Sequence, residues 1–67
     1  MNWDQIAGKW TEMKGSVTER WGDLTDDELT KLGGKRDRLA GLIQQKYGLA
    51  KEEAERQIND FEKSCKC

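Results

Sequence analysis

The chain has 67 residues, of which 37% are charged and 34% hydrophobic, with 12 basic and 13 acidic side chains and a net charge of -1 at pH 7. A chain this short buries only roughly 60% of the surface that it exposes when unfolded, so we expect one domain with a small core. The balanced charge gives no overall attraction to nucleic acid or to an anionic membrane. No apolar run approaches a membrane span and the N-terminus lacks a signal-peptide pattern, so a cytoplasmic location is expected.

The first predicted element is a helix from about residue 3 to residue 21. Asn2 with Gln5 forms a capping-box pattern at its start, and Gly22 follows as a natural stop. Its apolar residues recur every three or four positions, which is the spacing of one helix face: Trp3, Ile6, Trp10, Met13, Val17 and Trp21.

Three further helices are predicted in the rest of the chain. A short one begins at the N-cap Thr25, with Glu28 in the capping-box position, and ends near Gly33. The next one ends at Gly48, and the last lies within residues 51 to 63. The apolar faces of these last two helices consist of Leu39, Leu42, Ile43 and Tyr47, and of Ala54, Ile58 and Phe61.

A shift of 26 residues superimposes two similar stretches, "GKWTEMKGSVTERWG" and "GKRDRLAGLIQQKYG". We therefore predict an all-α fold, a small four-helix bundle made of two pseudo-repeated helical hairpins, about 3–32 and 34–62. These form a single domain, 1–64, and residues 65–67 are expected to be a flexible tail. The expected core consists of Trp3, Trp10, Val17, Trp21, Leu39, Ile43, Tyr47, Ile58 and Phe61.

Glycines occupy matching positions in the two copies, on faces predicted to lie opposite the apolar stripes: Gly8, Gly15, Gly34 and Gly41. Each mid-helix glycine costs about 0.8 to 1 kcal/mol relative to alanine. Either another helix or a partner approaches the backbone closely at these back-face glycines, or the helices are weak and order only under some conditions. A third explanation is that the glycines are tolerated by evolutionary drift, but drift does not readily place glycine at matching positions in two copies.

The residue types argue against an enzyme, a cofactor or a metal site. The chain has no histidine, Cys65 and Cys67 have no imidazole partner, and the serines lack a nucleophile-elbow context. The pairs Asp26/Asp27 and Glu52/Glu53 are explained by the positive ends of helix dipoles. The two cysteines are too close together to staple a fold, so we expect a monomer with a frayed tail. A disulfide dimer or an inter-chain metal site through this tail is the alternative.

The densest basic cluster is the candidate partner-binding site and consists of Lys31, Lys35, Arg36 and Arg38. Asp37 interrupts it and the whole chain is slightly acidic, so a solvated charged face is favoured over binding to a phosphate backbone. Nucleic acid is an unlikely partner by this reasoning but is not excluded, and no membrane contact is expected. The tryptophans, at helical spacing in so short a chain, are expected in the core rather than as base-stacking groups.

The segments "GKWTEMKGSVTERWGDLTDDEL" and "GKRDRLAGLIQQKYGLAKEEAERQINDFE" resemble the CsbD-like family of small bacterial general stress response proteins. The resemblance covers residues 2 to about 62, and the Ser64-Cys65-Lys66-Cys67 tail departs from it. It implies a cytoplasmic, stress-induced protein with paired helical hairpins, no catalytic residues and no established activity.

The hydrophilic, glycine-rich composition also resembles that of hydrophilins, which protect other macromolecules during water loss. The sequence thus favours a non-enzymatic stress protein that shields an unknown protein or other macromolecular client. The alternative is a helical interaction module that binds a protein or nucleic acid through the basic region Lys31 to Arg38.

Overall fold

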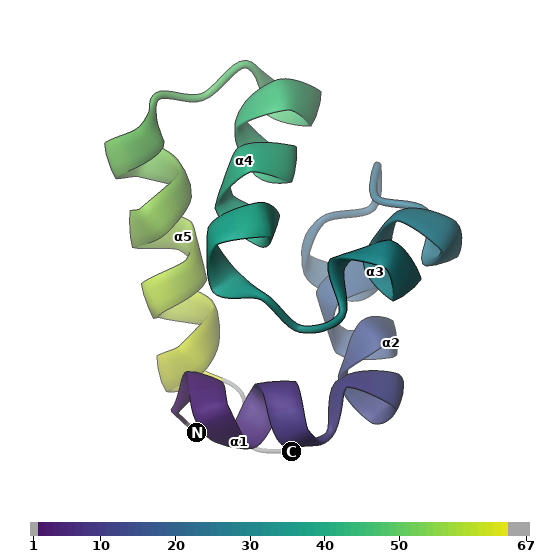
Figure 1. Ribbon diagram of the computed structural model, residues 1–67. Coiled ribbons are helices and arrows are strands. Elements are labelled where there is room, and N and C mark those ends of the chain that lie inside the picture. The colour runs from purple at the N-terminus through teal and green to yellow at the C-terminus, as the bar shows by residue number, and fades with distance from the viewer. Residues whose placement is uncertain (1, 65–67) are drawn as a thin grey trace.

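The computed structural model describes residues 2–64, and every regular element in that range is a helix. The predicted all-α class is therefore confirmed. Figure 1 shows α4 and α5 side by side, with α2 and α3 as a second pair and α1 lying across their base. The bounds of the helices are α1 (Trp3–Gly8), α2 (Trp10–Arg20), α3 (Asp26–Leu32), α4 (Arg36–Tyr47) and α5 (Lys51–Ser64).

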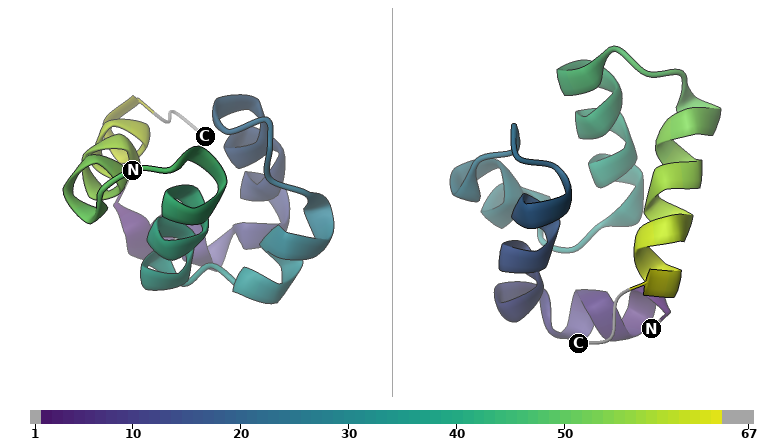
Figure 2. Two further views of the ribbon diagram at one scale, coloured as in Figure 1. Left: turned by 90° about the horizontal axis from the view of Figure 1, so that it is seen from above. Right: turned by 180° about the vertical axis from the view of Figure 1, so that it is seen from behind.

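The continuous helix predicted for residues 3 to 21 is wrong, because the chain bends at Lys9 and forms two helices there. Figure 2 shows α1 running almost across the axis of α2. In this bent chain both indoles reach the segment formed by α3 and the turn that follows it. Trp3 Nε1 donates to the Gly34 carbonyl and Trp10 Nε1 to the Leu29 carbonyl, each at 2.7 Å. These tertiary bonds explain why residues 2–64 contain five helices where the sequence predicted four.

The predicted helix ends agree closely with the structure. At α1 the Asn2 side chain accepts a hydrogen bond from the Gln5 backbone N–H at 2.9 Å, and Gln5 reciprocates. The same reciprocal capping box joins Thr25 and Glu28 at α3. Gly48 caps the end of α4 with a φ of 66°. These signals depend on residues three or four positions apart, which is why they can be read from sequence.

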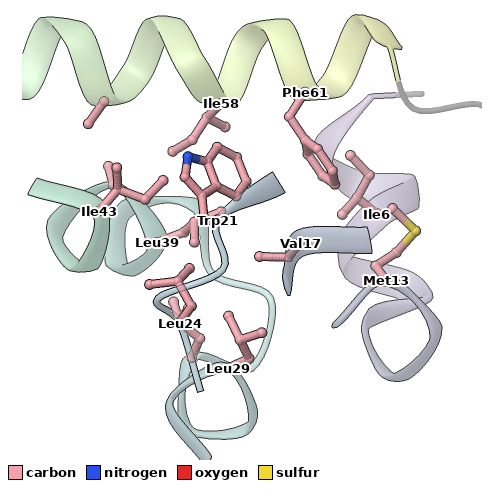
Figure 3. Close-up of a cluster of buried hydrophobic side chains, with 13 residues drawn as sticks. Ile6, Met13, Val17, Trp21, Leu24, Leu29, Leu39, Ile43, Ile58 and Phe61 are labelled. Carbon is pink, nitrogen blue, oxygen red and sulfur yellow. The ribbon is translucent and has the colours of Figure 1, made fainter. Parts of the chain in front are cut away.

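The core runs between the two helix pairs and is drawn in Figure 3. Of the expected core residues, Trp3 and Trp10 are only partly buried and pack against the edge of the cluster. The prediction for Tyr47 is wrong: its side chain is 38% exposed and its hydroxyl accepts the Asp23 backbone N–H at 3.1 Å. The buried cluster consists of Ile6, Met13, Val17, Trp21, Leu24, Leu29, Leu32, Leu39, Ala40, Ile43, Ala54, Ile58 and Phe61.

Helices α2 in the N-terminal half and α4 in the C-terminal half begin 26 residues apart, at Trp10 and Arg36. This offset equals the shift that superimposes the two sequence stretches. A Gly-Lys pair stands directly before each helix, with Lys9 and Lys35 as the N-caps. The paired glycine and lysine of the sequence therefore mark helix starts in both halves. The following helices, α3 and α5, pack against α2 and α4 respectively.

Candidate functional site

Arg36 of the predicted basic cluster is half-buried and bonded to α5. Its guanidinium donates to Asn59 Oδ1 at 2.6 Å and pairs with Glu62 Oε1 at 3.3 Å and Glu55 Oε1 at 3.8 Å. The three partners are four and three residues apart on α5 and so share one helix face. Arg36 therefore ties the start of α4 to α5, and its charge is compensated by two carboxylates.

The other three cations of the cluster, Lys31, Lys35 and Arg38, are exposed. Within residues 2–64 none of them forms an ion pair with a carboxylate. Lys31 and Arg38 border a hollow of about 240 Å³ between α3 and α4, whose other lining residues are Glu28, Leu32 and Leu42. Lys35 borders a second hollow, of about 540 Å³, beside α1, and Arg38 borders this one too. The structure thus splits the predicted cluster between two neighbouring hollows.

Glu28 links the capping box of α3 to the end of α4. Its carboxylate accepts the Thr25 backbone N–H at 3.0 Å and pairs with Lys46 Nζ at 3.0 Å. The Thr25 hydrogen bond, with a further contribution from Lys46, lowers the pKa of Glu28 below its ordinary 4.5. Glu28 is the only acidic residue that lines the hollow between α3 and α4, and its carboxylate is already bonded to Thr25 and Lys46.

We expect Glu28→Gln to lower the melting temperature at pH 7. This gap in melting temperature between the parent and the variant should close in acid. Because the folded pKa of Glu28 is lowered, its ionised form contributes stability above about pH 4.5, and this contribution is lost as the pH falls through the folded pKa. Circular dichroism melts of both proteins between pH 7 and pH 3 measure the gap. Glu52→Gln is the control, since Glu52 is exposed at the start of α5. A gap for Glu28→Gln that stays constant with pH would contradict this assignment.

The structure separates the four back-face glycines into two kinds. Gly8, Gly15 and Gly41 are exposed, and a Cβ added at any of them would meet no atom within 4 Å beyond its chain neighbours and the backbone of its own helix. Gly34 is different: it precedes α4, is buried and has a φ of 81°, so it does not lie on an exposed helix face. An added Cβ there would stand 3.2 Å from the Ala7 Cα. The close-approach explanation therefore applies to Gly34 and fails for the other three within the chain itself.

Sequence reasoning missed that the two aromatic-Gly corners meet. The Tyr47 hydroxyl, at the end of α4, reaches the backbone beside the Trp21-Gly22 corner. Trp21 Nε1 donates to Gln57 Oε1 at 2.9 Å on α5. The repeated aromatic-Gly motif was the signal that could have found this contact. These corners border a depression of about 490 Å³ with two cations and two anions, lined by Arg20, Trp21, Tyr47, Leu49, Glu53, Arg56, Gln57 and Asp60.

Among residues 2–64 no three histidine, cysteine or acidic side chains gather where they could hold a metal ion. No helix in that range is both long enough and apolar enough to cross a membrane. The predicted tail cysteines, Cys65 and Cys67, lie outside the described residues.

Comparison with known proteins agrees with the sequence resemblance. The CsbD-like family profile matches residues 4–56. A UPF0337 protein of Nitrosomonas europaea is 52% identical over 97% of this chain and 69% of its own length. One from Bordetella pertussis is 52% identical over 91% of this chain and 92% of its own, and YjbJ of Escherichia coli K12 is 50% identical over 92% and 90%. The chain therefore belongs to the CsbD-like family, a family of general stress-response proteins whose molecular function is uncharacterised.

Proposed function

We propose that this chain is a non-enzymatic cytoplasmic stress protein that shields other macromolecules during water loss, in the manner of a hydrophilin. The observation that carries the proposal is the open space around Gly15 and Gly41, each in the middle of a long helix. Alanine would fit at both positions without a clash. The two glycines therefore weaken α2 and α4 without any packing benefit in the described chain, which is expected if the helices order conditionally.

The composition of the surface supports the same proposal. The core contains no buried polar or charged residue, so the charged side chains of residues 2–64 are at least partly hydrated. Tyr47 is the one large hydrophobic side chain exposed in that range. Such a surface holds water and offers little apolar area for self-association, so the protein can stay dispersed at high concentration among its clients. In this proposal the two hairpins are pseudo-repeats that double one weakly helical, hydrated unit.

The test is a drying and rehydration assay on a sensitive enzyme such as lactate dehydrogenase. We expect the chain to preserve more enzyme activity than an equal mass of a small, stably folded control protein. Protection no better than that of the control would overturn the proposal.

The variant Gly15→Ala/Gly41→Ala tests the role of weak helices. Each substitution removes a helix penalty of about 0.8 to 1 kcal/mol, which raises the melting temperature by about 4 to 8 °C per kcal/mol. We expect the stabilised variant to protect the enzyme less well than the parent does at the same concentration. Circular dichroism melts check the first expectation and the drying assay the second. Equal protection by the variant would remove conditional ordering from the mechanism.

A further inference from the structure

The hollow between α3 and α4 combines an apolar floor with a positive rim. Leu32 is 4% exposed and, with the partly buried Leu42, forms the floor. Lys31 stands in the last turn of α3 and Arg38 in the first turn of α4, so one cation comes from each helix. Figure 1 shows that a turn joins α3 to α4, and the two helices contact each other.

The positive charge of this rim is uncompensated in the described chain. Lys31 and Arg38 form no ion pair with any residue between 2 and 64. Glu28, the acidic lining residue, is bonded to Thr25 and paired with Lys46. Only four cations between residues 2 and 64 have an acidic partner within 4 Å, namely Lys14, Arg36, Lys46 and Arg56. Lys31 and Arg38 differ from the other unpaired cations because together they border a hollow with two leucines. A partner that carries carboxylates would pair with these two cations.

The size and chemistry of the hollow favour a peptide over a nucleic acid. Its volume of about 240 Å³ lies below the roughly 300 to 1,000 Å³ of small-molecule pockets and suits one apolar side chain. Nucleic acid affinity comes mainly from phosphate contacts, which need cations and gain nothing from a leucine floor. An acidic peptide with an apolar residue can pair with the cations of the rim and also pack on the leucines of the floor.

We propose that the hollow between α3 and α4 binds a short acidic peptide segment of another protein. One apolar side chain of the segment packs on Leu32 and Leu42, and its carboxylates pair with Lys31 and Arg38. This interaction goes beyond the shielding function and does not depend on it, because it uses one fixed surface rather than the hydration of the whole chain.

Fluorescence anisotropy with a labelled ten-residue peptide tests the proposal. The probe has a central leucine-phenylalanine pair flanked on both sides by glutamates. Two matched peptides replace either the glutamates by glutamines or the apolar pair by serines, and a 20-base-pair DNA duplex is titrated in parallel. We expect the probe to bind and both matched peptides to bind at least about tenfold more weakly. No binding at 1 mM, equal binding of a matched peptide, or tighter binding of DNA would overturn the proposal.

Lys31→Gln/Arg38→Gln is the decisive variant, and Lys51→Gln/Lys63→Gln is its control. Both remove two positive charges, but Lys51 and Lys63 lie on α5, away from the hollow. We expect about tenfold weaker peptide binding from the first variant and parental binding from the second. Equal loss in both variants would show a general charge effect and overturn the site. If the first variant melts below the parent, amide shift mapping of the parent decides: the probe must shift Lys31, Arg38 and Leu42, and shifts confined to other residues overturn the proposal.

Discussion

Replacing Ile58 with alanine is expected to cost about 2 to 5 kcal/mol of folding free energy. The Ile58 side chain is fully buried on α5 and lies beside Trp21 in the cluster between the two helix pairs. The substitution loses apolar burial and leaves a cavity that close-packed neighbours fill only in part. A domain of this size has little stability in reserve, so we expect the cooperative transition to weaken or vanish at 37 °C. Urea unfolding followed by circular dichroism and tryptophan fluorescence measures the change.

The matched control for this prediction is Ile58→Val, which removes one methylene group at the same place. It is expected to cost about 0.5 to 1.5 kcal/mol, and the cooperative transition should persist. If alanine cost no more than valine, the core around α5 would be loosely packed or α5 would be detached in solution. Either result would contradict the single buried cluster that joins α5 to the other helices.

Gly34→Ala is expected to destabilise the fold by about 2 kcal/mol or more. The φ of 81° at Gly34 is left-handed, which costs an L-residue about 1 to 2 kcal/mol. The new Cβ would also stand 3.2 Å from the Ala7 Cα, so the backbone of α1 would have to shift. Such a shift disturbs the 2.7 Å hydrogen bond from Trp3 to the Gly34 carbonyl. Urea unfolding, with tryptophan fluorescence reporting on Trp3, measures both effects.

Gly41→Ala adds the same methyl group seven residues further along the chain, within α4, and provides the control. Gly41 is exposed in the middle of α4 with open space around it, so this substitution should stabilise the protein. The two alanine variants are therefore expected to have opposite signs. Stabilisation by both would mean that α1 does not pack on the turn before α4, and the Trp3 contact would lose its support.

Local signals in the sequence predicted much of the secondary structure. The capping boxes at Asn2 and Thr25 and the stop at Gly48 are confirmed because each depends on residues only a few positions apart. The leucines of the linker and of the short α3 escaped the predicted core, since a seven-residue helix shows too few turns to display a periodic face. Leu24, Leu29 and Leu32 are nevertheless buried.

The sequence identified the residues of the candidate partner site but not how they are arranged. Composition identified the basic cluster, but no spacing rule could reveal that Arg36 meets Asn59 and Glu62, which are 23 and 26 residues away in the chain. Nor could it place Leu42 beside Arg38 and Lys31 as the floor of a hollow, because that depends on how α3 packs against α4.

The sequence by itself determined the helical class, most helix ends and the family, because helix periodicity, capping and motif similarity are carried by neighbouring residues. Only the tertiary structure decided the bend at Lys9, the burial of Gly34 and the exposure of Tyr47. Each of these follows from a contact between distant segments, such as the bonds of Trp3 and Trp10 to carbonyls 31 and 19 residues away. Such bonds favour a bent chain over a continuous helix, because the bent chain gives the N–H groups of two partly buried indoles a hydrogen-bond partner.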